Sequence, residues 1–225
     1  MNKFLELDNI SKTFETSKKL KVIKNLSYNF KKGKIYSLMG PSGSGKSTLL
    51  NLISLIDKPS NGLIKFNKHQ INYDDKEQND QIRAKKIGIV YQQNNLLPDF
   101  TSLENIYLAS LSINNNKNLA ISKAKQLLQK IGLSSRADHY PSQLSGGEAQ
   151  RIAIARAIIN DPEIILADEP TGSLDIKTAK IIFKLLKDQK RSDRLIVFAT
   201  HNRFFGNKAE CLVEILDGKI KSSNG

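Results

Sequence analysis

The residues of clearest chemical character form a glycine-rich segment between an apolar strand and a predicted helix. Glycines at positions 40, 43 and 45 precede Lys46 and Ser47, in the pattern G-x-x-x-x-G-K-[ST]. The glycines let the backbone curl so that successive N–H groups point at one anion, and the helix start adds positive potential. The lysine suits the β and γ phosphates of a nucleotide, and the serine hydroxyl suits Mg²⁺. The predicted phosphate-binding residues are Gly40, Pro41, Ser42, Gly43, Ser44, Gly45, Lys46, Ser47 and Thr48.

Two carboxylates follow a second apolar strand. Asp168 and Glu169 come directly after residues 163–167. Ligand sites of open parallel sheets lie at the carboxyl ends of strands, so both side chains should lie at the ligand edge. Asp168 is the predicted partner of Mg²⁺, through water, and Glu169 is the predicted group that polarises the attacking water. The alternative for Glu169 is that it complements the dipole of the next helix.

The segment LSGGEAQR, residues 144–151, predicts a capped helix start that accepts an external anion. Ser145 and Glu148 have the S-x-x-E spacing of a capping box. Gly146 and Gly147 have no Cβ, so an external group can approach the N–H donors closely. The chain already has a phosphate loop of its own, so this is a second expected anion site.

This segment resembles the signature motif of the ATP-binding cassettes of ABC transporters. In that family two cassettes pair head to tail, and each ATP lies between the phosphate loop of one subunit and the signature of the other. The resemblance therefore implies ATP as the nucleotide and a second cassette, most simply an identical copy, as a partner. The signature residues expected to contact the partner's ATP are Leu144, Ser145, Gly146, Gly147 and Glu148.

Four further positions match the same family in order along the chain. Gln92 resembles the glutamine that reaches Mg²⁺ and the water, and His201 resembles the histidine that contacts the γ-phosphate. Asp175 resembles the D-loop aspartate that crosses the dimer interface. Phe14 stands where the family stacks an aromatic ring on adenine, although tyrosine is more usual there. The resemblance implies three catalytic residues, Glu169, His201 and Gln92, and three metal-site residues, Ser47, Gln92 and Asp168.

The elements that must position these residues alternate between strands and helices. Strands are predicted at residues 4–10, 21–30, 35–39, 63–67, 87–91, 163–167, 195–199 and 211–216. Helices are predicted at residues 46–56 and 176–189, and residues 101–160 are predicted to be almost wholly helical. Interleaved strands and helices indicate a parallel α/β core, and the helical middle indicates an inserted lobe.

The resemblance refines this architecture. It implies a P-loop NTPase core of the ABC ATPase type, with a parallel sheet, N-terminal antiparallel β strands and an inserted helical subdomain. The chain, residues 1–225, would then be a single ABC ATPase domain. Its core subdomain would comprise about residues 1–93 and 160–225, and its helical subdomain about residues 94–159.

Composition limits the location and the partners. The 225 residues include one cysteine, the first residues lack the apolar core of a signal peptide, and no run approaches 18 apolar residues. These features favour a reducing compartment and a chain that does not cross a bilayer by itself. The resemblance to ABC cassettes implies a peripheral protein at the cytoplasmic face of a bacterial inner membrane, which contacts the membrane through a permease. The 35 basic and 22 acidic residues give a net charge of +13. Lysine-rich composition or an anionic membrane surface explains this charge, and we expect no direct nucleic-acid contact.

Several segments resemble one branch of the family, which serves lipoprotein release, macrolide-type efflux and cell division. They are residues 94–98, 101–105 and 167–172. Residues 139–144 and 199–202 most resemble the lipoprotein-releasing cassettes, whereas Ser173 replaces the asparagine usual in the branch. The resemblance implies that ATP closes a dimer and that the Gln92 loop transmits this closure to the permease. Macrolide or peptide efflux and a cell-division cassette are the alternatives.

Two other classes of function would account for parts of the sequence. A soluble ABC ATPase that acts on DNA or ribosomes would account for the positive charge, but such relatives usually carry tandem cassettes or long coiled-coil insertions. A chain of 225 residues has no room for either. A regulatory scaffold that binds ATP but scarcely hydrolyses it is disfavoured by Glu169 and His201.

Overall fold

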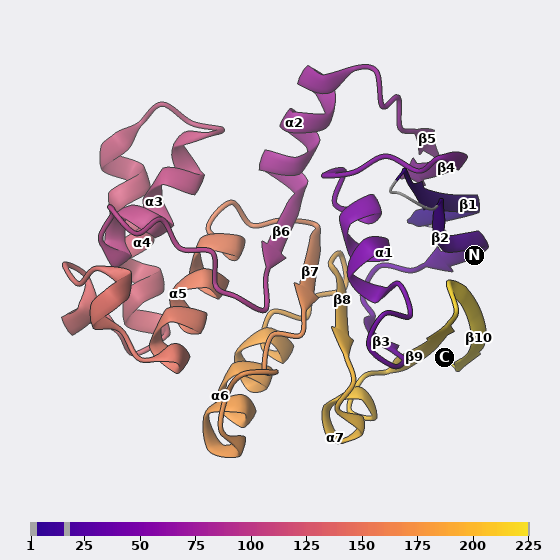
Figure 1. Cartoon of the computed structure of the whole chain (residues 1–225). Helices are drawn as coiled ribbons and strands as arrows, with labels where there is room; N and C mark the ends of the chain where they lie inside the picture. The colour runs from indigo at the N-terminus through magenta and orange to yellow at the C-terminus, as the bar shows by residue number, and fades with distance from the viewer. Residues whose placement is uncertain (1–3, 16–18, 225) are drawn as a thin grey trace. The chain divides into compact units, whose positions relative to one another are not determined.

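The structure, a computed structural model, describes residues 4–15 and 19–224 and contains two compact units (Figure 1). Unit 1 consists of the described residues up to Asp80 and those from Lys190 onward, and unit 2 is Gln81–Gln189. Helix α2 (Lys76–Lys86) contains the chain boundary between them. The subdomain limits predicted from the sequence, near residues 94 and 159, are a different division and stay a prediction.

Unit 1 begins with an antiparallel sheet in the order β2-β1-β4-β5. Strand β1 (Leu5–Phe14) pairs with β2 (Leu20–Phe30) and β4 (Asn61–Phe66), and β4 pairs with β5 (His69–Gln70). The buried side chains Leu5, Leu7 and Ile10 of β1 belong to the apolar core. The antiparallel N-terminal strands expected from the family resemblance are therefore confirmed.

The other strands of unit 1 surround β3 (Ile35–Met39). It pairs in parallel with β8 (Leu195–Thr200) on one side and with β9 (Cys211–Leu216) on the other. Strand β10 (Lys219–Asn224) adds to β9 in the antiparallel direction. Every residue of β3 and β8 is buried, as the unbroken apolar runs predict. This unit also contains helices α1 (Lys46–Ile53) and α7 (Arg203–Gly206).

Unit 2 combines a pair of parallel strands with a group of helices. Strand β6 (Ile87–Val90) pairs with β7 (Ile164–Asp168). Helices α3 (Ser102–Leu111), α4 (Lys117–Lys130) and α5 (Gly146–Ile158) pack together, as Figure 1 shows, around buried side chains that include Ile106, Leu128 and Ile152. Two short 3-10 turns, η1 (Ser134–Arg136) and η2 (Pro141–Gln143), precede α5, and α6 (Ile176–Lys187) follows β7.

The structure departs from the predicted elements in several places, and β5, α7 and β10 were not predicted. The helix predicted at residues 46–56 ends at Ile53, because Leu55 adopts a left-handed conformation with φ 61°. Helix α2 was not predicted, since it buries only Asn79 and therefore has no apolar periodicity. Within the described part of the chain, we find no helix with the length and apolar character needed to span a membrane.

Candidate nucleotide site

The phosphate loop of unit 1 joins β3 to α1. No side chain caps the N-terminus of α1. The N-cap residue is Gly45, which has φ 103° and no side chain that could accept a hydrogen bond from the first N–H groups. Helices α3, α5 and α6 instead begin with capping side chains, from Thr101, Ser145 and Asp175 respectively. Unsatisfied N–H groups at a helix start attract anions. The first turn of α1 is therefore suited to a ligand that supplies the missing acceptors.

Gly40 and Lys46 determine how closely the backbone of this loop packs. Gly40 has φ 153°, and a Cβ at this position would lie 2.1 Å from the carbonyl oxygen of Ile215, so only glycine fits. Lys46 is 7% exposed, and its Nζ donates to the carbonyl oxygens of Gly40 at 2.9 Å and Pro41 at 3.0 Å. The ammonium group is thus held within the curl of the backbone, where phosphate oxygens would compete for the same hydrogen atoms.

The structure places His201 beside the phosphate loop. His201 follows β8 directly and lines a cavity of about 490 Å³ together with Gly40 and Pro41. Arg203 of α7 lines the same cavity and adds a guanidinium group that sequence analysis missed. Its only signal in the sequence is its position two residues after the histidine. Both side chains could therefore interact with an anion in the loop.

Phe14 lies at the end of β1 with a partly open ring. Its side chain is 38% exposed, and the Lys12 ammonium lies 5.0 Å from the ring centroid. Lys12 is itself held by a salt bridge to Asp57. The lysine therefore braces the ring through a cation–π contact while the exposed part stays available for stacking.

In unit 2, the ends of β6 and β7 bring three of the predicted residues to one edge. The strands run parallel with Val90 opposite Ala167, so Gln92 lies beyond the same end as Asp168 and Glu169. Glu169 has φ 43°, a left-handed conformation that costs about 1–3 kcal/mol for a residue with a side chain. Such strain is concentrated at functional sites, where the surrounding structure maintains it.

The signature segment forms the predicted capped helix start at α5. Ser145 Oγ accepts a hydrogen bond from the Glu148 N–H at 3.3 Å, and Glu148 Oε2 accepts from the Ser145 N–H at 2.9 Å. Arg136 Nε donates to the other carboxylate oxygen at 2.9 Å. Arg136 and the Ser145 hydrogen bonds together lower the pKa of Glu148 to about 2. Ser145 and Gly146 are exposed, so the helix start is accessible from solvent.

The start of α6 lies directly beside the signature. A Cβ at Gly147 would come within 2.4 Å of Thr178 Cγ2, which shows how closely the two helices approach. Asp175 is the N-cap of α6, and its Oδ1 accepts from the Thr178 N–H at 3.0 Å. These bonds from Thr178 lower the pKa of Asp175. Asp175 therefore has a local structural role, besides the interface role predicted for it.

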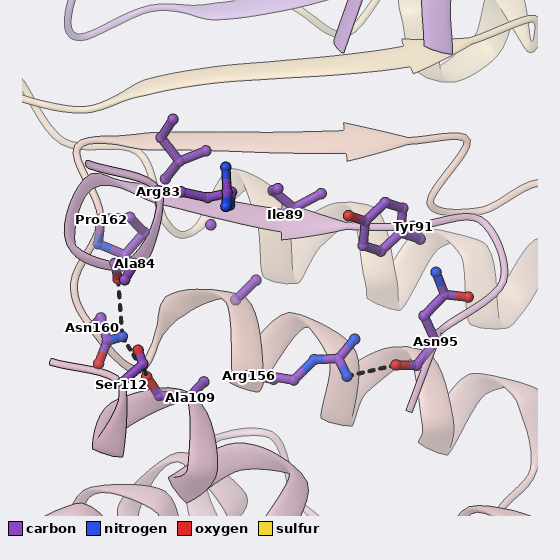
Figure 2. A pocket seen from close by; sticks show the side chains of 13 residues that line it. Arg83, Ala84, Ile89, Tyr91, Asn95, Ala109, Ser112, Arg156, Asn160 and Pro162 are labelled. Atoms are coloured by element: carbon purple, nitrogen blue, oxygen red, sulfur yellow. Dashed lines mark hydrogen bonds between the residues drawn. The ribbon is translucent and has the colours of Figure 1, made fainter. Parts of the chain in front are cut away.

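A cavity of about 290 Å³ lies in unit 2 beside the Gln92 loop (Figure 2). Arg156 of α5 reaches across it and donates to the carbonyl oxygens of Asn95 at 2.6 Å and Asn94 at 2.8 Å. Burial lowers the pKa of Arg156. The signature helix thus holds the segment that follows Gln92 through a single guanidinium group.

The opposite end of this cavity is built around Asn160. Its Nδ2 donates to the carbonyl oxygens of Ala84 at 3.1 Å and Ala109 at 2.7 Å, as Figure 2 shows. Its Oδ1 is buried and accepts no hydrogen bond from the residues that the structure describes. Arg83 of α2 also lines the cavity. No sequence pattern indicated this cavity, because its lining comes from three stretches that are far apart in the chain, residues 83–95, 109–112 and 156–162.

Comparison with known proteins identifies the family. The family described as "ABC transporter" matches residues 23–172. The chain therefore belongs to the ABC transporter family, as an ATP-binding cassette, and it is an ATPase. A solved dimeric structure of the ATP-binding cassette MJ0796, in a post-hydrolysis state bound to ADP and Pi, has a TM-score of 0.91 and 38% identity, covering 98% of this chain and 97% of that one.

Two relatives carry a more specific name. The chain is 41% identical over 226 residues to "Lipoprotein-releasing system ATP-binding protein LolD" of Rickettsia bellii, covering 99% of both chains. It is 38% identical over 221 residues to the protein of the same name from Cytophaga hutchinsonii, covering 98% of this chain and 100% of the relative. The predicted resemblance to lipoprotein-releasing cassettes is confirmed, whereas the roles of individual site residues stay predictions.

Proposed function

We propose that this cassette powers a separate membrane permease that releases lipoproteins from the inner membrane. The observation that carries the proposal is its identity of 41% with a lipoprotein-releasing cassette across 99% of both chains. In this role the cassette binds the cytoplasmic face of the membrane through the permease. Its own substrate is ATP, and the acylated cargo contacts only the permease.

The chemistry would be divided among the predicted site residues. The phosphate loop and Lys46 hold the phosphates, and Phe14 stacks on the adenine. Glu169 accepts a proton from the attacking water, while His201 contacts the γ-phosphate. Electrostatic stabilisation of this kind supplies most of the catalysis of phosphoryl transfer.

The oxygen donors present fit Mg²⁺. Ser47 is exposed at the start of α1, and Asp168 ends β7 with a carboxylate. Mg²⁺ prefers oxygen ligands and commonly takes one or two carboxylates, with the remainder from water and substrate phosphates. Ser47, Asp168 and Gln92 would hold the ion. When bound, it neutralises the charge that develops on the phosphates.

The second anion site indicates a head-to-tail dimer. In this arrangement the open start of α1 binds the phosphates of ATP, and the start of α5 in a second copy, with its exposed Gly146, closes over the γ-phosphate. The dimeric state of the MJ0796 cassette supports this arrangement. Because one chain carries both half-sites, two identical copies are sufficient.

The cavity beside the Gln92 loop is the proposed contact with the permease. Arg83 and Arg156 line it, and the buried Oδ1 of Asn160 lacks a donor among the described residues. A permease segment that inserts a carboxylate and one N–H or O–H group would satisfy both features. Because Arg156 also holds the Asn94 and Asn95 carbonyls, insertion there would act on the segment after Gln92.

Reconstitution tests the proposal. The cassette is purified with its permease from the native membrane, and the complex is placed in vesicles that contain a labelled lipoprotein. We expect ATP-dependent release of the acylated protein into solution. Transport of a macrolide or a peptide, or co-purification with division proteins instead, would overturn lipoprotein release and assign another member of the branch.

A further inference from the structure

The charge of Glu148 poses a problem for the shared site. Its carboxylate lies in the first turn of α5, and Ser145 and Arg136 fix it there by hydrogen bonds. The pKa of about 2 keeps it ionised at any physiological pH. The proposed occupant of the same helix start is the γ-phosphate of a partner's ATP, which is also an anion. Two anions at the same helix start repel unless a cation lies between or beside them.

Capping the helix does not by itself require Arg136. The start of α3 has the same capping box: Glu104 Oε2 accepts from the Thr101 N–H at 2.8 Å and from its hydroxyl at 2.9 Å. The Glu104 N–H donates to Thr101 Oγ1 at 3.3 Å, which equals the distance in α5. No ion pair to Glu104 exists among the described residues, and Lys117 makes only the smallest contribution to its pKa. A capping box of this geometry therefore forms without an arginine.

Arg136 is brought to Glu148 by a separately anchored segment. It ends the turn η1, and the carbonyl oxygens of Ala137 and His139 that follow accept hydrogen bonds from Leu103 and Ser102 of α3. Its guanidinium is partly exposed, with 41% of the side-chain surface accessible, whereas the Glu148 side chain is 17% accessible. The cation therefore lies at the surface next to the signature, where an incoming phosphate would experience its field.

We propose that Arg136 is a positioning residue that neutralises Glu148, so that the signature end of α5 can accept the triphosphate bound by a second cassette. This inference rests on the proposed shared site. It explains why the box at α5 carries an arginine and the box at α3 does not. Arg136 acts through Glu148 and through the local field, without being required for the helix to form.

ATP-driven dimerisation of the full-length chain tests this proposal. The assay uses light scattering in the Glu169→Gln background, where hydrolysis is blocked. Arg136→Met should raise the ATP concentration for half-maximal dimerisation about tenfold, the usual size for losing a charge at a close pair. Arg136→Lys should retain most of the affinity, because the positive charge remains. Addition of Glu148→Gln to Arg136→Met should recover the lost affinity, because the uncompensated charge is then gone.

The rescue separates charge compensation from a structural role. If the ion pair only tied two segments together, it would be broken in both Arg136→Met and the double variant, and no recovery would follow. Absence of recovery, or wild-type dimerisation by Arg136→Met, would overturn the inference. Thermal unfolding of each variant controls for folding. Gly146→Asp serves as the reference for the shared site: if it dimerises normally with ATP, the proposed head-to-tail site itself fails, whatever Arg136 does.

Discussion

Gln92 and Glu169 flank the same glycine. A Cβ placed on Gly172 would lie 3.3 Å from the Gln92 side-chain nitrogen and 3.5 Å from Glu169 Cβ. The Gly172 N–H also donates to the Glu169 carbonyl oxygen at 3.0 Å, which closes a turn directly after the left-handed Glu169. The loop proposed to contact the permease and the residue proposed to activate water therefore both pack against Gly172.

Gly172→Ala should therefore impair hydrolysis without impairing nucleotide binding. The added methyl group is closer to the Gln92 amide than ordinary van der Waals contact allows, so the amide must shift. A misplacement of about 1 Å at a catalytic site can cost about 10²-fold in rate, so a shift of a few tenths of an ångström should lower the rate about severalfold. Steady-state phosphate release from the permease complex should show a lower kcat at unchanged ATP affinity. An unchanged kcat would show that the Gln92 position is not critical.

Glu169→Gln should trap an ATP-bound dimer. The groups that bind the phosphates remain, whereas loss of a positioned base lowers the rate about 10²–10⁴-fold. Light scattering with ATP should report the mass of two chains, and the unsubstituted chain assayed in parallel is the control. A persistent monomer would argue against Glu169 as the base.

Gly146→Asp should abolish turnover while the monomer still binds ATP. The new carboxylate adds both bulk and a negative charge at the start of α5, where the partner's phosphate is expected. A fluorescent ATP analogue measures binding by the monomer, and phosphate release measures turnover. Retained ATPase activity would contradict a site shared between two copies.

Arg83→Glu should uncouple the cassette from its permease. The substitution reverses one of the charges that line the cavity beside the Gln92 loop, so a carboxylate on the permease would be repelled. We expect at least about a tenfold weaker association, with the basal ATPase activity of the isolated cassette retained. Lys85→Glu is the matched control, since this lysine is exposed on α2 and does not line the cavity. Equal effects of the two substitutions would exclude a specific site.

Stability should fall in acid partly through Glu210. Burial raises the pKa of this carboxyl, but hydrogen bonds from Lys190 and the Ile35 N–H, with the charge of Lys34, lower it further than burial raises it. The folded pKa therefore lies below the unfolded value of about 4.3, so the stabilisation is complete above that pH and is lost as pH falls through the folded pKa. Urea midpoints of Glu210→Gln and wild type should differ at pH 7 and converge once the pH falls below the folded pKa.

The parts of the site predictable from the sequence are those encoded by short spacings. The phosphate loop and the Ser145–Glu148 capping box each occupy a few consecutive residues whose backbone needs are local. The parallel strands were likewise predictable, because strands buried on both faces are apolar throughout.

Features that depend on distant segments were not predictable. Arg136 meets Glu148, 12 residues away, only because an irregular segment is tied to α3. Arg156 holds carbonyl oxygens 61 and 62 residues earlier in the chain, and no residue type marks a carbonyl as an acceptor. Helix α2 was missed for a different reason, since a helix that buries one side chain leaves no periodic pattern.

Because Gly45 caps α1 without a side chain, binding and release of nucleotide should change the hydrogen bonding of the first turn of α1. The side chains of Ser145 and Asp175 accept hydrogen bonds from N–H groups in the first turns of α5 and α6. No side chain caps α1, so a bound anion would supply the acceptors for its first N–H groups. Loss of a bound anion would return amide hydrogens of this turn to water. We therefore expect amide hydrogen exchange in the first turn of α1 to slow when nucleotide binds, so that exchange there reports occupancy.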